Sequence, residues 1–328
     1  MTRPGLNGLL VLGLVLAAVA GTSFGEAQLS FAQYVDAFVH PADPAGQILW
    51  TVRAPRVAAA GVVGACLGLS GGLLQGLLRN PLADPGVLGV SASAALGAAV
   101  SIVLGLSAVP GGVEAAALGG ALAGGLVLVA FAARFPEPEA LILFGVALAG
   151  FAGALTALVF NLSPSPIATA EVLAWLMGSV ENRSWLDVGR TLIPLALAAG
   201  LAVQAGRGLR ALTLGEETAA TTGLDMRRLK LFAVIGASLA TGAAVAMAGI
   251  IGFVGLAAPH LVRAAVREDP ARLLAPSALA GALILILADL AARLTPTDQE
   301  LKLGVFTALV GAPLFALVAW RAARSWRA

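Results

Sequence analysis

The chain has 328 residues, of which 59% are hydrophobic and 12% are charged, and its formal net charge is +2. This composition excludes a soluble globular protein, and so small a net charge, scattered among apolar segments, excludes a nucleic-acid-binding protein. The single cysteine, Cys66, excludes an internal disulfide and argues against a metal cluster. We expect an all-α, polytopic membrane protein whose residues 1–328 form one transmembrane domain within the lipid bilayer.

Ten apolar segments follow along the chain, and each is expected to cross the membrane as a helix. They are residues 8–24, 57–78, 88–108, 113–133, 140–162, 188–206, 229–248, 252–266, 276–293 and 303–320. The first could be read as a secretory signal, but nine spans follow it and we expect it to be retained. The eighth is short and contains Pro259, which is tolerated at membrane depth where protein surrounds the helix. Glycines four apart, as at Gly64, Gly68 and Gly72, fit close helix packing.

The basic residues predict how the chain sits in the membrane. Most of the 20 lysines and arginines fall on the side that holds both termini, which the positive-inside rule makes the cytoplasmic side. The protein is therefore expected in the cytoplasmic (inner) membrane with both termini in the cytoplasm. The opposite side, or its boundary, holds Arg53, Arg56, Arg183, Arg190, Arg293 and Lys302.

Two of these outward residues, Arg53 and Arg56, flank a proline directly before the uncharged run from Val57 to Leu78. Guanidinium groups pair bidentately with carboxylates, so these residues could receive an acidic partner protein. They could equally be interfacial anchors that snorkel toward lipid headgroups, and the spacing alone does not decide between the two.

The ninth span carries Asp289 and Arg293, which lie one helical turn apart on the same face. An acid inside the membrane is a candidate ion or proton site. The neighbouring arginine and the nearby outer boundary favour a structural ion pair instead. Arg293 could also join Arg53 and Arg56 as a third outward contact.

The outer segment 163–187 is expected to hold a short helix at about residues 167–177, after Ser163-Pro164-Ser165-Pro166. Such a helix could lie over the outer mouth as a lid. The alternative is a simple interfacial re-entry, with Trp175 and Trp185 as aromatic residues of the membrane interface.

The longest cytoplasmic segment, residues 207–230, is punctuated by glycines. Gly215 can end one turn, the acidic pair Glu216 and Glu217 favours the start of a short helix, Gly223 stops it, and Asp225 can cap the next one. Two small helices of this kind would form a knob that docks into a cytoplasmic partner. A plain helical linker is the alternative.

Two further cytoplasmic segments are Arg79-Asn80-Pro81-Leu82-Ala83-Asp84-Pro85-Gly86 and Pro259-His260-Leu261-Val262-Arg263. In the first, Asp84 is expected to cap the third span and Pro85 to take its first helical position. In the second, His260 has no second histidine or cysteine beside it and makes a poor metal site. A hydrogen-bonding role at the inner boundary is expected for it, and no metal site is expected in the chain.

The order of several short motifs matches a known family. The matching residues are Arg53-Ala54-Pro55-Arg56, Gly68-Leu69-Ser70-Gly71-Gly72-Leu73-Leu74-Gln75, Arg79 to Pro85, Trp175-Leu176-Met177-Gly178-Ser179, Leu214-Gly215-Glu216, Gly252 to Leu256 with Pro259 to Arg263, Asp289 to Arg293, and Gly311-Ala312-Pro313. Through them the chain resembles, nearly end to end, the permease subunits of type II ABC importers for iron chelates, heme and cobalamin.

The resemblance implies ten helices, a homodimer with the substrate path between its two copies, two cytoplasmic ATP-binding subunits, and an extracytoplasmic substrate-binding protein. The binding protein's carboxylates would be received by Arg53, Arg56 and Arg293. The ATPase subunits would grip residues 215–228, at Gly215, Glu216, Glu217, Ala219, Ala220, Gly223 and Leu224. The fifth span and the helix at 167–177 would form the gate and pathway, at Leu162, Ser163, Pro164, Trp175 and Gly178. One departure is visible: Lys302 stands where the family usually has proline.

The chain contains no Gly-rich loop ending in Gly-Lys-Ser/Thr, so we do not expect it to be an enzyme that hydrolyses ATP. It is expected to bind no cofactor itself, since ATP and magnesium would belong to the partner ATPase. The alternative is an ion-coupled secondary transporter that uses Asp289. An iron–siderophore is the first expectation for the cargo, because it is the commonest cargo of the family, with heme and cobalamin behind it.

Overall fold

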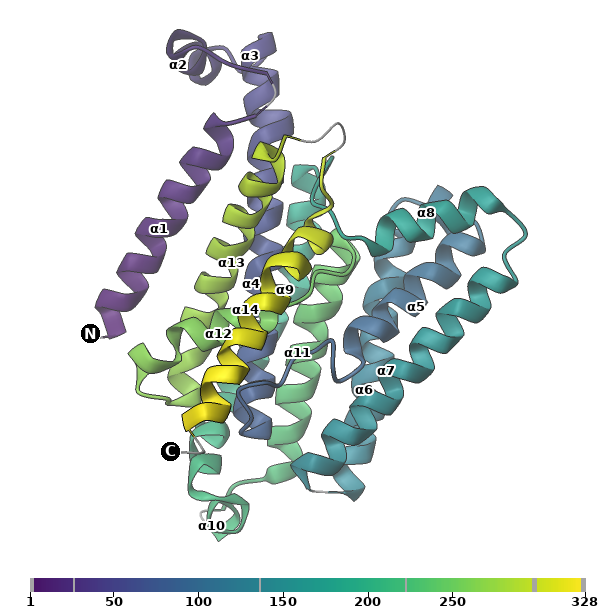
Figure 1. Cartoon of the computed structure of the whole chain (residues 1–328), viewed down its shortest axis with the longest axis vertical. Coiled ribbons are helices and arrows are strands. Elements are labelled where there is room, and N and C mark those ends of the chain that lie inside the picture. The colour runs from purple at the N-terminus through teal and green to yellow at the C-terminus, as the bar shows by residue number, and fades with distance from the viewer. Residues whose placement is uncertain (1–2, 26, 136, 222, 297–299, 326–328) are drawn as a thin grey trace.

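The protein is described by a computed structural model that covers residues 3–25, 27–135, 137–221, 223–296 and 300–325. Within these ranges all regular secondary structure is helical (Figure 1). Each expected span has a matching helix, as follows: α1 (Arg3–Ser23), α4 (Ala54–Leu78), α5 (Val90–Val103), α6 (Gly112–Arg134), α7 (Pro138–Asn161), α9 (Trp185–Ala211), α11 (Met226–Ala248), α12 (Val254–Arg263), α13 (Pro270–Leu294) and α14 (Leu303–Ser325). The all-α expectation is therefore confirmed.

Length separates these helices into two groups. Among the described residues, 7 helical stretches are long and apolar enough to cross a membrane by themselves. The shorter apolar helices include α5, α12 and the part Leu303–Leu317 of α14. Short helices of this kind need protein around them to satisfy their ends at membrane depth. The structure thus supports a multi-pass membrane protein, and the count of ten spans stays a prediction.

The second span begins earlier than the sequence predicted. A continuous helical rod of 35 residues, Pro44–Leu78, is built from α3 (Pro44–Gln47), the π-helix η1 (Ile48–Arg53) and α4. The π-turn, in which the Ala54 N–H donates to the Leu49 carbonyl, lies directly before Pro55 and lets the helix pass a residue that lacks its own N–H. At 1.5 Å per residue the rod is about 52 Å long, more than the hydrocarbon core requires. Arg53 and Arg56 consequently lie on a helix and not in a loop before it.

Helix α4 crosses the centre of the bundle against α13. Small residues allow this approach: a Cβ on Gly64 would lie 2.2 Å from the carbonyl oxygen of Gly281, and one on Gly68 would lie 2.1 Å from that of Ser277. These distances are far below any real carbon–oxygen contact, so the two backbones touch only because Gly64 and Gly68 have no side chain. The predicted packing role of this glycine series is confirmed.

The remaining helices surround this centre (Figure 1). Helices α5, α6 and α7 form a group on the right of the view, and the short α8 (Pro166–Leu176) lies across their upper end. Helix α8 confirms the short helix predicted at about 167–177, and the hydroxyl of Ser165 caps it by accepting the N–H of Ala168. A small helix, α2 (Phe31–Val39), stands at the same end beside α3.

Burial distinguishes central from peripheral helices. In the apolar windows of α4 and α11, 78% of the residues are buried, against 11% in α1 and 17% in α7. Apolar side chains such as Leu143 (73% exposed) and Phe151 (64% exposed) project outward from α7. In a protein this apolar, such faces contact lipid or another polypeptide.

The turn between α4 and α5 corrects one prediction. Asp84 does not cap a helix that starts at Pro85: its Oδ1 accepts the N–H of Gly86 at 2.8 Å, and α5 begins only at Val90, after Gly89 with φ 80°. Aspartate readily bonds the backbone two residues on, and that local turn competes with helix capping. The left-handed glycine is the feature that finally sets the start of α5.

Candidate functional site

Arg53 lies at the end of the bundle that we call the arginine end, which carries Arg53, Arg56 and Arg293. Its side chain is buried, with 5% exposed. Its Nη1 donates to the carbonyl oxygens of Thr22 at 3.0 Å and Ser23 at 3.1 Å, and its Nη2 donates to that of Ala27. Arg53 therefore fastens the end of α1 to the rod, and its predicted role in receiving a partner is not tested by these contacts.

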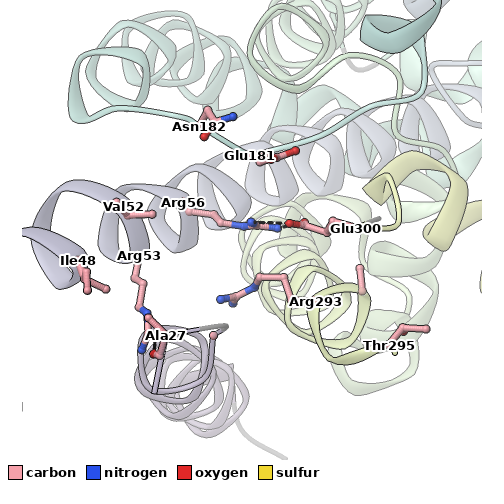
Figure 2. Close-up of a pocket in the computed structure, with 12 residues that line it drawn as sticks. Ala27, Ile48, Val52, Arg53, Arg56, Glu181, Asn182, Arg293, Thr295 and Glu300 are labelled. Atoms are coloured by element: carbon pink, nitrogen blue, oxygen red, sulfur yellow. Dashed lines mark hydrogen bonds and ion pairs between the residues drawn. The ribbon is translucent and has the colours of Figure 1, made fainter. Parts of the chain in front are cut away.

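Arg56 lies one turn further along the rod and is shared by two carboxylates. Its Nε and Nη2 donate to Oδ1 of Asp289 at 3.1 and 2.8 Å. Its Nη1 donates to Oε2 of Glu300 at 3.0 Å, and Nη2 also contacts Oε1 of the same residue (Figure 2). Both edges of the guanidinium are thus occupied within the chain.

Arg293 completes the cluster from α13. Its Nε lies 3.1 Å from Oδ2 of Asp289, which confirms the ion pair predicted one helical turn apart. Its Nη2 and Nη1 donate to the carbonyl oxygens of Gly21 and Phe24, each at 3.0 Å. Asp289, only 2% exposed, is therefore held between two guanidinium groups. Such a carboxylate is a structural counter-ion and has no free face for a transported ion.

A cavity of about 370 Å³ opens among these side chains. Figure 2 shows Arg53, Arg56 and Arg293 around it, with Glu300 bonded to Arg56, and Glu181 and Asn182 on the other side of Arg56. Guanidinium groups that line a cavity attract carboxylates or phosphates. The sequence indicated that the three arginines could act together, and they line this one cavity. Nothing in the sequence predicted that Glu300 would lie beside them.

Lys302, the departure noted in the sequence, has a partner of its own. Its Nζ lies 3.1 Å from Oε2 of Glu181, in the connection between α8 and α9. Both side chains are about one-third exposed, so the pair contributes at most about 1 kcal/mol. Lys302 thus contributes an ion pair across the rim.

The predicted gate residues lie where three elements meet at the arginine end. Gly178, with φ 72°, follows α8 and accepts the N–H of Gly304 at 3.3 Å. A Cβ on Gly249 would lie 2.1 Å from the carbonyl oxygen of Trp175, so α8 and the end of α11 also touch. The other three predicted residues, Leu162, Ser163 and Pro164, form the turn between α7 and α8, where Leu162 is 70% exposed.

The predicted coupling segment lies at the opposite end, which we call the α10 end (Figure 1). Gly215, with φ 96°, ends a 3-10 turn, and α10 (Glu216–Thr221) follows. Gly223 has φ 80°, and the carboxylate of Asp225 accepts the N–H of Arg228 at 3.1 Å. Each of these local predictions is confirmed.

The second small helix predicted for this segment is wrong. After Gly223 the chain enters α11 directly, because Asp225 caps that long helix. The segment is therefore one six-residue helix between two glycines with positive φ. Ala219 is buried and Leu224 packs against the core, whereas the side chains of Glu217 and Ala220 lie outside the described part of the chain.

The remaining predicted residues stabilise the α10 end. Arg79, with φ 48°, ends α4. In the connection that follows, the amide oxygen of Asn80 accepts the N–H of Leu82 at 2.9 Å. Pro81 and Pro85 lie in the same connection. Arg263 donates to the side-chain oxygen of Gln75 and so ties α12 to α4.

Pro259 is buried within α12, and the ring of His260 meets that of Phe315 edge-on at 6.0 Å. His260 belongs to no group of three or more possible metal ligands among the described residues, where the group found is Asp36, His40 and Asp43 beside α2. Exposed acids of this kind are common without an ion, and their spacing in the sequence did not predict this group.

Most of the chain matches the model of one known protein family. The profile of the FecCD transport family matches residues 10–321. The chain belongs to the FecCD transport family.

Individual relatives support the same family assignment. A protein of Halobacterium salinarum named cobalamin import system permease protein BtuC is 41% identical over 270 residues, 82% of this chain and 72% of that one. The vitamin B12 import system permease protein BtuC of Vibrio cholerae serotype O1 is 42% identical over 275 residues, 82% of this chain and 81% of that one. An uncharacterized ABC transporter permease, YvrB of Bacillus subtilis, is 41% identical over 286 residues, 85% and 80% of the two chains.

A solved structure of a metal-chelate type ABC transporter in an inward-facing conformation is also similar. Its TM-score is 0.83 at 31% identity, and the match covers 97% of this chain and 99% of that one. This FecCD-family chain is therefore the membrane permease of a type II ABC importer, and ATP hydrolysis occurs in separate subunits. ATPase and binding-protein partners follow from that assignment, and the ion-coupled alternative is not retained.

Proposed function

We propose that this permease imports cobalamin, or a closely related corrinoid, across the cytoplasmic membrane. The observation that carries the proposal is that relatives 41% and 42% identical to this chain are named for cobalamin and vitamin B12 import. This moves cobalamin ahead of the iron–siderophore expected from the resemblance alone. Iron chelates and heme are the competing cargoes within the same family.

The proposal includes a homodimer with the substrate path between two copies. The exposed apolar face of α7 supports it, together with Leu309 (66% exposed) and Leu314 (50% exposed) on α14. A second copy would cover such faces. Helix α8 and the turn from Leu162 to Pro164 lie beside α7 and would border the path.

The proposed orientation places both termini and the α10 end in the cytoplasm, because most lysines and arginines lie there. The ATPase subunits would then grip α10 between Gly215 and Gly223. The arginine end faces the binding protein, whose carboxylates would enter the cavity beside Arg56 and Arg293. The permease itself is proposed to bind no cofactor or metal, with ATP and magnesium held by the ATPase subunits.

Uptake into proteoliposomes tests the cargo. The permease, its ATPase subunits and the binding protein of the same system are reconstituted, and labelled cyanocobalamin, a ferric siderophore and heme are offered separately. We expect ATP-dependent accumulation of cyanocobalamin alone. Accumulation of the siderophore or heme in its place overturns the cargo, and uptake that follows a proton gradient without ATP overturns the energy source.

A charge reversal tests the docking surface. We expect Arg56→Glu to weaken binding of the substrate-binding protein, because a carboxylate would then face the partner's carboxylate. Loss of a buried charge-assisted pair costs about 2–5 kcal/mol, and loss of an exposed one far less. Surface plasmon resonance on the nanodisc-embedded complex measures this affinity, and an unchanged value refutes the docking role.

A further inference from the structure

Glu300 occupies one edge of the Arg56 guanidinium. The other edge is taken by Asp289, and the two acids differ in burial: Asp289 is 2% exposed and Glu300 is 26% exposed. Asp289 lies on α13 inside the bundle, whereas Glu300 stands on the cavity rim three residues before α14 begins at Leu303. Glu300 is thus the acid that a partner entering the cavity can reach and displace.

The charges of four side chains at the arginine end balance one another, while Arg53, which also lines the cavity, donates to backbone carbonyls. Arg56 and Arg293 face Asp289 and Glu300, and both edges of Arg56 donate within the chain. An incoming carboxylate would therefore meet four ion-paired side chains with no net charge, and only one N–H of Arg56, the second on Nη1, that does not already donate. It can gain the bidentate contact only if one of the resident carboxylates leaves.

We propose that Glu300 acts as an internal substitute for the partner's carboxylate and sets how tightly the binding protein docks. This inference rests on the proposed docking role of Arg56. Docking exchanges one arginine–carboxylate pair for another of the same chemistry, so the net gain is much smaller than for an unoccupied arginine. The exchange keeps docking reversible, and it releases the segment that leads into α14.

The test compares affinities of the binding protein, loaded with cyanocobalamin, for the complete transporter in nanodiscs. We expect Glu300→Gln to bind about threefold to tenfold more tightly, the range for a partly exposed ion pair. Glu300→Asp, which keeps the charge, should return toward the wild-type affinity. Glu114→Gln on α6 is the matched control, since it removes one negative charge without contacting Arg56.

A double variant separates the two proposals. In Arg56→Ala, the additional change Glu300→Gln should give no further gain, because Glu300 acts through that arginine. If Arg56→Ala weakens docking while Glu300→Gln leaves the affinity unchanged, the substitute role is wrong and the docking role stands. If Arg56→Ala has no effect, the docking role itself fails.

A second, independent feature is an apolar groove of about 620 Å³ between α4, α9 and α13. Its floor is formed by Ala65 and Leu69 of α4, and Val203 on the α9 wall is 79% exposed. All three helices are long enough to cross the membrane, so the groove lies within the membrane-spanning part of the chain. Arg207 and Arg210 close it at the α10 end.

The two arginines differ in their partners. Arg210 pairs with Asp269 at 3.0 Å, whereas Arg207 makes no ion pair or hydrogen bond within the described residues. From Leu195 to Arg210 the groove follows α9 for about 22 Å, comparable to an extended acyl chain. A cationic group at the cytoplasmic boundary of an apolar groove between helices suits an anionic lipid headgroup.

We infer that this groove holds an anionic phospholipid of the cytoplasmic leaflet, with its headgroup on Arg207 and one acyl chain along α9. Native mass spectrometry of the transporter, extracted from membranes that contain phosphatidylglycerol, measures the lipid retained. We expect Arg207→Ala and the groove-filling Ala199→Leu each to reduce retention at least threefold. Arg134→Ala, an exposed arginine at the end of α6, is the control that should retain lipid like the wild type. Equal retention in all four proteins overturns the inference.

Discussion

The crossing of α4 and α13 gives the sharpest prediction. A Cβ on Gly64 would lie 2.2 Å from the carbonyl oxygen of Gly281, and a Cβ on Gly281 would lie equally close to that of Gly64. Gly64→Ala therefore forces the two helices apart by about 1 Å to reach an ordinary contact. Overpacking of this kind costs about 1–3 kcal/mol, of which the better helix propensity of alanine offsets up to about 1 kcal/mol.

Moving α4 and α13 apart also strains the ion pair between Arg56 and Asp289. Arg56 precedes Gly64 by 64 − 56 = 8 residues, and Asp289 follows Gly281 by 289 − 281 = 8 residues, so the antiparallel crossing sets the register of their pair. We expect the midpoint of thermal unfolding in detergent to fall by about 2–6 °C. Gly119→Ala in α6, where a Cβ would meet nothing within 4 Å, is the matched control and should be neutral or slightly stabilising. Equal midpoints for Gly64→Ala and Gly119→Ala would refute the packing argument.

Three further predictions concern single residues. Asp289→Asn should lower stability by about 2–4 kcal/mol, because it leaves Arg56 and Arg293 facing one another while largely buried; an unchanged unfolding midpoint would contradict this. Burial raises the pKa of Asp84, so the unfolded chain releases that proton first, and the free energy of unfolding falls as pH rises from about 4 toward the raised pKa. Asp84→Asn should remove this pH-dependent fall in the free energy of unfolding. Unfolding midpoints that change with pH in parallel for the variant and the wild type would contradict the prediction. Gly215→Ala should cost about 1–3 kcal/mol locally, since its φ of 96° and ψ of 153° suit glycine alone, and should reduce substrate-stimulated ATPase activity of the assembled transporter; full stimulation would exclude a strained turn there.

Much of the fold could be read from the sequence because hydropathy and glycine spacing act locally. Each expected span has its helix, and Gly215, Gly223 and Asp225 punctuate the chain as predicted. The errors arose where two local preferences competed. The carboxylate of Asp84 accepts a hydrogen bond in its own turn and does not cap a helix. The π-turn before Pro55 lets the helix continue through a proline, a residue that normally interrupts a helix.

The site was predictable only in part, since a pattern along the chain does not show which distant charges meet. The pairing of Asp289 with Arg293 follows from helical spacing, but Arg56 finds Asp289 233 residues away and Glu300 244 residues away. Glu300 stood in a segment without periodicity, so nothing in the sequence singled it out. The same holds for Gln75 and Arg263, which meet across two helices.

The uninterrupted course of α4 has a mechanical consequence. Its 25 residues run from the charged cavity beside Arg56 to the left-handed turn at Arg79 without a hinge. A stiff shaft about 37 Å long that tilts by about 5° carries its far tip sideways by roughly 3 Å, comparable to the displacement needed to break or make a hydrogen bond. A force that tilts α4 at one membrane surface can thereby displace the other end of the helix sideways at the opposite surface.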